Sequence, residues 1–216
     1  MKKKLCLALS GALCLSAGVG CGTETTEETL TPVRLNEVVH SVFYAPQYVA
    51  QELDFFEEEG LDVSVAVGNG ADKSMTALLS DSADIALLGT EAGLYVYAEG
   101  KADYPKTFAQ LTQRAGNFLV SREEEPDFQW SDLERKSVIG GRLGGMPEMV
   151  LEYVIKENGM TIGKDMEIIN NIDFTSTAGA FLGEVGDYTV EFEPAATTLE
   201  QSGKGHIVAS LGELLC

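Results

Sequence analysis

The chain has 216 residues, and its 34 Asp and Glu residues against 15 Lys and Arg residues give a formal net charge of −19. With 44% hydrophobic and 23% charged residues, the composition is that of a packed globular protein and excludes a disordered chain. The acidic balance also argues against nucleic acid and anionic membrane surfaces as partners, because both are bound by clustered Lys and Arg.

The N-terminal stretch has the layout of an export signal. Three lysines at positions 2–4 precede an uncharged apolar run over 5–16, which is too short to span a bilayer as a stable helix. Small residues then lead to Cys21, which resembles the acylated Cys of a bacterial lipobox; the alternative is an ordinary secretory signal cut nearby. Residues 22–31 are rich in Thr and Glu and predict a flexible tether.

Apolar periodicity predicts alternating strands and helices in the body of the chain. Leu61, Val63 and Val65 alternate with other residues as in a strand, whereas apolar residues over 46–59 recur at helical spacing. This alternation indicates an α/β fold with largely parallel sheets and helices on both faces. In chain order, we expect strands at 33–39, 61–67, 84–88, 108–111, 117–121, 137–140, 167–172, 188–192 and 206–211, and helices at 46–59, 72–80, 91–98, from 147 onward, 175–182 and 194–201.

Candidate ligand-binding residues follow the predicted strands of the first half. In open α/β sheets, ligands bind beyond the carboxyl ends of the strands, where helix N-termini present free N–H groups. The loop after the first strand crowds an imidazole, a hydroxyl and two aromatic rings together, although such residues also serve as core plugs. Two later turns combine small residues with polar ones, as ordinary turns and helix caps also do. The candidates are His40, Ser41, Phe43, Tyr44, Asn69, Gly70, Gly89, Thr90 and Glu91.

The second half adds a glycine-rich loop at 140–147. Glycines between a strand and a helix can form a nest of backbone N–H groups, and Arg142 adds a cation, so this loop is expected to favour an anion. Hydroxyls at the start of a later helix could bind a ligand or only cap the helix, and a carboxylate at a strand end could accept from a ligand amine. These candidates are Arg142, Gly144, Gly145, Met146, Ser176, Thr177 and Glu191.

Catalytic and metal-binding patterns are absent from the sequence. It contains no HExxH, CxxC or GxSxG motif, and its only histidines are His40 and His206. The glycine-rich loop lacks both the Walker ending and the dinucleotide spacing. We therefore expect neither catalytic residues, nor a metal, nor a cofactor, and a protein that holds a small molecule without transforming it.

Four segments resemble one family of binding proteins. They are HSVFYAPQYVAQ at 40–51 followed by DFFEEEGLDV at 54–63, ALL at 77–79 with ADI at 83–85, GGR at 140–142 with GG at 144–145, and GDY at 186–188 before EP at 193–194. On these segments the chain is similar, over about residues 33–211, to the nitrate/sulfonate/taurine and thiamine-pyrimidine-precursor family of periplasmic-type binding proteins.

The resemblance implies a type II periplasmic-binding-protein-like fold, in which two lobes close on a ligand about a hinge. It places a signal at 1–20, the lipidated Cys21 and tether at 21–31, lobe one at 32–107, the hinge crossing at 108–120 and lobe two at 121–205. Residues 206–216 would begin the return to lobe one. In the family pattern, the residues that complete lobe one come after this point. The implied partners are a small solute and the permease subunits of an ABC importer. The protein would be a monomer held by lipid at the outer face of the bacterial cytoplasmic membrane.

Two alternatives remain open at this stage. An enzyme that makes the thiamine pyrimidine precursor shares this fold, but its cysteine-rich motif and its lysine near the active histidine have no counterpart close to His40. The candidate residues also favour two different classes of ligand. Arg142 and the glycine-rich loop favour a sulfonate or another anion, whereas Phe43, Tyr44 and Glu191 favour a flat heteroaromatic solute.

Overall fold

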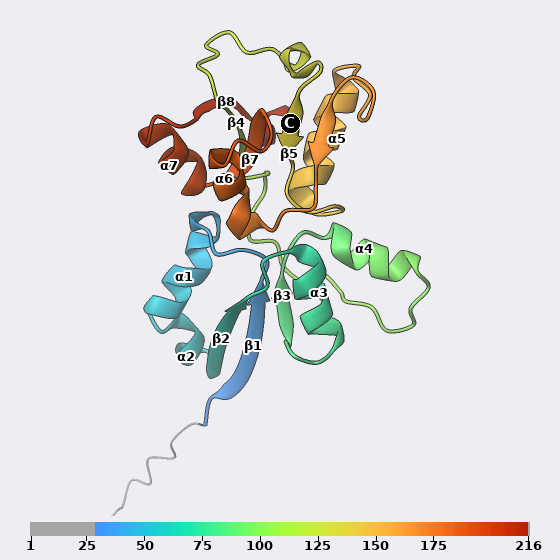
Figure 1. Ribbon diagram of the computed structural model, residues 1–216. Helices are drawn as coiled ribbons and strands as arrows, with labels where there is room; N and C mark the ends of the chain where they lie inside the picture. The colour runs from blue at the N-terminus through green and yellow to red at the C-terminus, as the bar shows by residue number, and fades with distance from the viewer. Residues whose placement is uncertain (1–28, 216) are drawn as a thin grey trace, which may run out of the picture.

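The protein folds into two lobes that lie end to end (Figure 1). The structure is a computed structural model that describes residues 29–215. The first lobe, lobe one, contains a small sheet with helices on both of its sides. Its elements are β1 (Thr31–Glu37), the 3-10 turn η1 (Val42–Tyr44), α1 (Ala45–Glu52), α2 (Phe55–Glu58), β2 (Leu61–Val67), α3 (Ala71–Leu79), β3 (Ile85–Leu87) and α4 (Glu91–Ala98).

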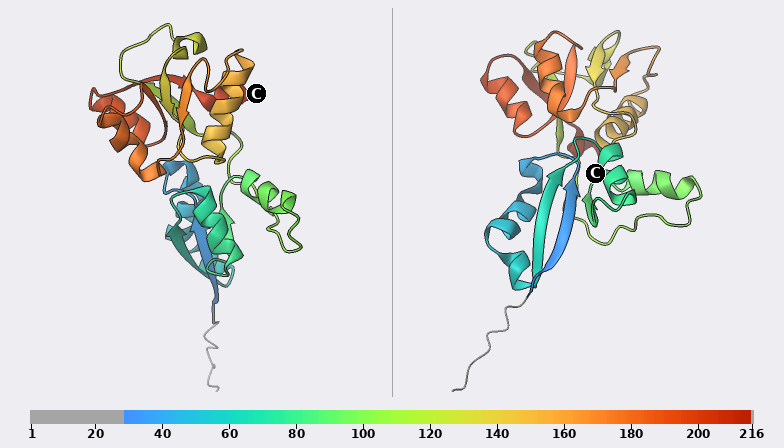
Figure 2. Two further views of the ribbon diagram at one scale, coloured as in Figure 1. Left: turned by 45° about the vertical axis from the view of Figure 1, so that its right-hand side comes forward. Right: turned by 60° about the horizontal axis from the view of Figure 1, so that its bottom comes forward.

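The second lobe, lobe two, contains a larger sheet, again between helices (Figure 2). A long segment without strand or helix connects it to α4. Its elements are β4 (Asn117–Ser121), η2 (Trp130–Leu133), β5 (Ser137–Ile139), α5 (Met146–Glu157), β6 (Glu167–Ile169), α6 (Phe174–Leu182), β7 (Tyr188–Phe192), α7 (Ala195–Gln201), β8 (His206–Ser210) and η3 (Leu211–Leu215).

The two sheets differ in strand direction. Lobe one has the order β2-β1-β3 with all neighbours parallel. Lobe two has the order β6-β5-β7-β4-β8, in which β5 runs parallel to β6 and β7 whereas β4 runs antiparallel to β7 and β8. The predicted α/β class with parallel sheets and helices on both faces is therefore confirmed, with a mixed sheet in lobe two.

Three details differ from the sequence prediction. The helix expected at 46–59 is split, because Asp54 adopts a left-handed conformation (φ 58°) that ends α1 and starts α2. Residues 108–111 form no strand, because no neighbouring strand pairs with them. Residues 117–120 and 206–210, expected in the crossings between lobes, belong to β4 and β8 and pair with each other in the sheet of lobe two.

Apolar clusters stabilise each lobe and also join the two lobes. Lobe two buries two clusters on opposite faces of its sheet, with Leu119 and Phe181 fully buried. Lobe one has a cluster around Val38, Tyr44 and Met75, and Phe174 from lobe two packs against it. The core of lobe one therefore extends across the junction between the lobes. Within residues 29–215, none of the helices has the length and apolar character needed to cross a bilayer.

The core of lobe two gives a direct stability test. We expect Leu119→Ala to lower the free energy of unfolding by about 3 kcal/mol, because it leaves a cavity beside an interior strand of the five-stranded sheet, where Leu119 is fully buried. Leu94→Ala, at a position that is 64% exposed on α4, is the matched control and should change it by less than about 0.5 kcal/mol. Urea unfolding followed by circular dichroism measures both; equal losses would contradict the assignment of this core.

Candidate ligand-binding site

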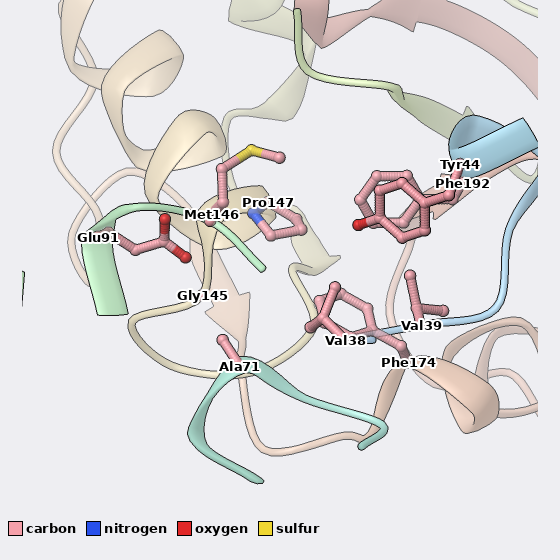
Figure 3. Close-up of a pocket in the computed structure, with 11 residues that line it drawn as sticks. Val38, Val39, Tyr44, Ala71, Glu91, Gly145, Met146, Pro147, Phe174 and Phe192 are labelled. Carbon is pink, nitrogen blue, oxygen red and sulfur yellow. The ribbon is translucent and has the colours of Figure 1, made fainter. Parts of the chain in front are cut away.

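A pocket lies between the lobes, at the ends of their strands. Its cavity volume is about 20 Å³, room for about one water molecule, so a larger ligand requires the lobes to move apart before they close on it. Strand exits of lobe one form one wall, and the first turns of α5 and α6 with the end of β7 form the other. The lining residues of this inner pocket are Val38, Val39, Tyr44, Ala71, Gly89, Glu91, Gly145, Met146, Pro147, Phe174 and Phe192 (Figure 3).

Aromatic rings from both lobes meet at one end of the inner pocket. The ring centroids of Phe174 and Phe192 are 5.9 Å apart in an edge-to-face arrangement. Phe43 packs behind them, with its centroid 6.0 Å from that of Phe192 and 5.5 Å from that of Tyr44. Because Tyr44 and Phe43 come from lobe one and the other two rings from lobe two, the aromatic end forms only when the lobes are in contact.

A single carboxylate, that of Glu91, reaches into the opposite end of the inner pocket (Figure 3). Glu91 begins α4 and is only 8% exposed. Its Oε1 atom is buried and has no hydrogen-bond partner in the protein. Burial raises the pKa of Glu91, while N–H groups of Glu91 and Met146 act in the opposite direction. An unpaired buried acceptor is costly unless a donor reaches it, so this end of the pocket is suited to a ligand N–H group.

A second, outer pocket adjoins the first and has a larger cavity volume of about 190 Å³. The two pockets share Ala71 and Gly145. The outer pocket lies between α3 and α4 of lobe one and the glycine-rich loop of lobe two, and its lining includes charged side chains. Its residues are Ala71, Asp72, Met75, Ala92, Tyr95, Val96, Glu99, Arg142, Leu143, Gly144 and Gly145.

The glycine-rich loop uses its polar groups within the protein. The N–H of Gly144 donates to Glu148 Oε2 over 3.2 Å, and the N–H of Gly145 donates to the carbonyl of Arg142 over 3.0 Å. The N–H of Leu143 donates to the carbonyl of Asn170. The Arg142 side chain pairs with Asp72 and Asp173. The amides of residues 143–145 and the cation of Arg142 are therefore already occupied by groups of the protein.

Several predicted residues of the first half lie beside the pockets and do not line them. His40 is exposed, and its Nδ1 lies 2.9 Å from Glu37 Oε1. Ser41 is buried and donates to the carbonyl of Glu193 across the lobe junction. Asn69, with φ 59°, and Gly70 form the turn before α3, and Thr90 is exposed. The structure thus brings Tyr44, Gly89, Glu91, Gly145 and Met146 together in the inner pocket, and Arg142, Gly144 and Gly145 in the outer one.

The predicted polar residues of α6 and β7 lie elsewhere. Ser176 is exposed, whereas Thr177 and Glu191 are buried inside lobe two. Thr177 Oγ1 donates to Glu191 Oε2 over 3.0 Å and Thr189 Oγ1 donates to Oε1 over 2.7 Å. Burial raises the pKa of Glu191 to about 7, and the two hydroxyls act in the opposite direction. Glu191 therefore accepts from two hydroxyls in the interior of lobe two and does not face either pocket.

The pocket residues missed by sequence reasoning are mainly apolar. Phe192 follows Glu191 directly, and because successive strand residues face opposite sides of a sheet, the ring faces the pocket when the carboxylate does not. All five residues of β7 are buried, so no polar alternation in the sequence marks which face meets the ligand. Phe174, the first residue of α6, is signalled only by its position after a strand.

Buried carboxylates outside the pocket have local partners. Glu37 is fully buried and accepts from Gln47 Nε2 over 3.2 Å and from the Tyr48 hydroxyl over 2.7 Å. Glu148 accepts from Asn170 Nδ2 over 3.3 Å in addition to Gly144, and burial raises its pKa. Across residues 29–215, no group of three or more His, Cys, Asp or Glu side chains is placed to hold a metal ion.

Two lobes of this architecture with a pocket between them define a type II periplasmic-binding-protein fold, and solved structures agree. The periplasmic nitrate-binding protein NrtA from Synechocystis PCC 6803 superposes with a TM-score of 0.68 at 19% identity, over 82% of this chain and 51% of that one. The periplasmic aliphatic sulphonate binding protein SsuA from Escherichia coli gives 0.61 at 14% identity, over 82% of this chain and 59% of that one. At these identities the likeness establishes the fold alone.

Sequence comparison establishes the family. The family described as "NMT1/THI5 like" matches residues 42–213, so the chain belongs to the NMT1/THI5-like family. A relative in Bacillus subtilis (strain 168), named "Putative binding protein YtlA", is 52% identical over 187 residues, which are 87% of this chain and 56% of that protein. The chain thus spans a little over half the length of the relatives it matches.

The buried Glu191 gives a pH-dependent stability. Its pKa is about 7 in the folded protein and near 4.5 when unfolded, so its contribution is fully present below pH 4.5 and is lost as the pH rises through 7. We therefore compare the free energy of unfolding of Glu191→Gln with that of the wild type at each pH. The difference, variant minus wild type, should rise by about 3 kcal/mol from pH 4.5 to pH 8. Urea unfolding at both pH values measures this difference. The exposed Glu123→Gln is the control; a constant difference between Glu191→Gln and wild type would refute the assignment.

Proposed function

We propose that this protein is the solute-binding component of an ABC importer and that it captures a small, flat heteroaromatic solute bearing an N–H donor. The observation that carries the proposal is the inner pocket, in which aromatic rings from both lobes face a buried carboxylate with one unpartnered oxygen. The named relatives support the general role, because they are binding proteins, among them periplasmic ones.

The aromatic end of the pocket supports a planar ligand. Tyr44, Phe174 and Phe192 expose ring faces and edges to one small space, and such surfaces favour stacking on another ring. Burial raises the pKa of the Tyr44 hydroxyl, with the nearby Glu37 carboxylate adding to the shift, so this hydroxyl stays protonated at neutral pH. A flat ring that enters between the lobes would therefore meet apolar surface on more than one side.

The charge of the inner pocket separates the two ligand classes. The side chains that line it include no Lys or Arg, and its single ionisable acid is Glu91. A sulfonate or nitrate in this space would have to lose its hydration beside a carboxylate without a compensating cation, which is unfavourable. An amino group or a ring N–H would instead supply the hydrogen bond that Glu91 Oε1 lacks. The pocket thus favours an aminopyrimidine-like solute, although two of the structural relatives are named for sulphonate and nitrate.

Binding without conversion is also part of this proposal, and the surroundings of His40 and Lys73 support it. The alternative, a synthase on the same fold, would use a histidine close to a reactive lysine. His40 instead pairs with Glu37, and the nearest lysine after it is Lys73, whose Nζ lies 3.0 Å from Asp173. In this proposal the monomeric protein releases its solute unchanged to the permease subunits. The signal and the lipid-bearing Cys21 lie outside the described residues, and the anchoring at the outer face of the cytoplasmic membrane is part of the proposal.

The ligand class can be tested by thermal shift of the purified protein. We expect 4-aminopyrimidines to raise the melting temperature and taurine, other sulfonates and nitrate to leave it unchanged, because a ligand that binds only the folded state stabilises it by mass action. Tyr44→Ala should weaken aminopyrimidine binding by roughly 1–3 kcal/mol, whereas Tyr97→Ala, on the exposed side of α4, should not. Stabilisation by sulfonates or nitrate, with none by aminopyrimidines, would overturn the proposal.

The role of Glu91 can be separated from that of the rings. We expect Glu91→Gln to reduce the preference for 4-aminopyrimidine over 4-methylpyrimidine by about tenfold or more, because the glutamine amide supplies its own donor and a weaker acceptor. Calorimetric titration of both ligands into wild type and variant measures the preference. If the preference is unchanged in Glu91→Gln, the carboxylate does not contact the amino group.

The anchoring part of the proposal has its own test. Expressed in a bacterium with a single membrane and an alkyne-labelled fatty acid, the wild-type protein should carry the label and sediment with membranes. We expect Cys21→Ser to lose the label and to appear in the medium, while Cys14→Ser, within the expected signal, behaves like the wild type. A labelled, membrane-bound Cys21→Ser protein would show that the anchor lies elsewhere.

A further inference from the structure

Four charged side chains alternate in sign across the junction between the lobes. Arg142 of lobe two pairs with Asp72 of lobe one through two contacts, Nε to Oδ1 at 2.9 Å and Nη2 to Oδ2 at 2.5 Å. Arg142 Nη1 also lies 2.7 Å from Oδ1 of Asp173 in its own lobe. The second oxygen of Asp173 lies 3.0 Å from Nζ of Lys73, which belongs to lobe one. We call these four residues the charge bridge.

The charge bridge is neutral overall and holds the lobes at two points. The pairs Asp72–Arg142 and Lys73–Asp173 each join one lobe to the other, and Arg142–Asp173 ties the two pairs together. The contact between Asp72 and the guanidinium is bidentate, which is the stronger and more directional form of this ion pair. The two cations lower the pKa of Asp173, consistent with a carboxylate that is charged in the bridge.

A glycine leaves space for the contact between Asp72 and Arg142. Gly70 precedes α3, and a Cβ atom there would lie 2.7 Å from Asp72 Oδ1 and 2.9 Å from Arg142 Cδ. Any residue other than glycine would therefore push against the pair. Asp72 and Lys73 are in the first turn of α3, and Asp173 is the residue before α6, so each partner is held on or beside a helix.

The position of the bridge relates it to the pocket entrance. Asp72 and Arg142 line the outer pocket, which adjoins the inner one through Ala71 and Gly145. Of the rings that meet between the lobes, Tyr44 and Phe192 are buried and Phe43 and Phe174 are half-buried, whereas the side chains of the bridge residues are 30% to 52% exposed. Interactions that are this exposed are screened by salt and are individually weak.

We infer that the charge bridge is a latch that biases the two lobes toward their closed arrangement and that Arg142 is its central residue, with a positioning role and not a role in contacting the ligand. Without Arg142, Asp72 would lose its cation partner, and of the two links between the lobes only Lys73–Asp173 would remain. Because exposed pairs are worth up to about 1 kcal/mol, the ratio of open to closed molecules should rise about fivefold in Arg142→Gln.

The latch can be tested in the absence of any ligand. Spin labels are attached to Glu58→Cys on α2 and Glu157→Cys on α5, both exposed and in different lobes, with the native cysteines replaced by serine. Pulsed electron–electron double resonance then gives the distribution of distances between the two labels at 50 mM and 1 M NaCl. We expect the longer-distance population to grow about fivefold in Arg142→Gln at low salt, and in the wild type at high salt, because salt screens the exposed pairs.

Two further variants make the result specific. Arg34→Gln removes an exposed ion pair with Asp84 that lies wholly within lobe one, so it should leave the distance distribution unchanged. The double variant Asp72→Asn with Arg142→Gln should open the lobes no further than Arg142→Gln alone, because both changes remove the same link. A distribution for Arg142→Gln that superimposes on that of the wild type, with the same salt response, would overturn the latch.

A consequence for ligand retention rests on the proposed function. If the latch closes the lobes on a solute, Arg142→Gln should release a bound 4-aminopyrimidine faster by the same factor of about five, with little change in the association rate. The distance measurement needs no ligand. If aminopyrimidines do not bind, the proposed ligand is wrong, and the distance measurement still tests the latch. If the distances do not change, the latch is wrong, and the proposed ligand is unaffected.

Discussion

The contact between the two lobes is the constraint on which the site depends. Neither lobe forms the inner pocket by itself, because Tyr44 and Glu91 belong to lobe one and Phe174 and Phe192 belong to lobe two. Phe174 packs against the core of lobe one, so that core extends across the junction into lobe two. Burial of these rings draws the lobes together, and the same burial raises the pKa of Glu91 and leaves its Oε1 without a protein donor.

Much of the fold could be predicted from local patterns. The strand at 61–67 and the helix at 91–98 lie where alternation and helical spacing placed them, because both signals depend on neighbours in the sequence. The break at Asp54 was not predictable from periodicity, since the apolar residues continue on both sides of it. The pairing of β4 with β8 depends on residues nearly ninety positions apart, which no local pattern encodes.

The sequence predicted the location of the candidate site better than it predicted the chemistry of that site. Strand-exit loops were expected to form it, and the inner pocket does contain Tyr44, Gly89 and Glu91. The glycine-rich loop and Arg142 suggested an anion, but the Gly144 N–H donates to Glu148, four residues further along the chain, and Arg142 pairs with Asp72 of the other lobe. Arg142 and Asp72 are separated by 70 positions, so only the fold reveals that the cation is already paired.

Two kinds of contact thus join the lobes: buried rings beside the inner pocket and exposed charges beside the outer one. The central claim is that a flat solute lies between these lobes and donates an N–H to Glu91. A crystal structure of the protein with a bound 4-aminopyrimidine tests it most directly. The account predicts the ring against Tyr44 and Phe192, with its amino nitrogen within hydrogen-bond distance of Glu91 Oε1. A ligand bound outside the space between the lobes, or one whose amino group faces away from Glu91, would contradict it.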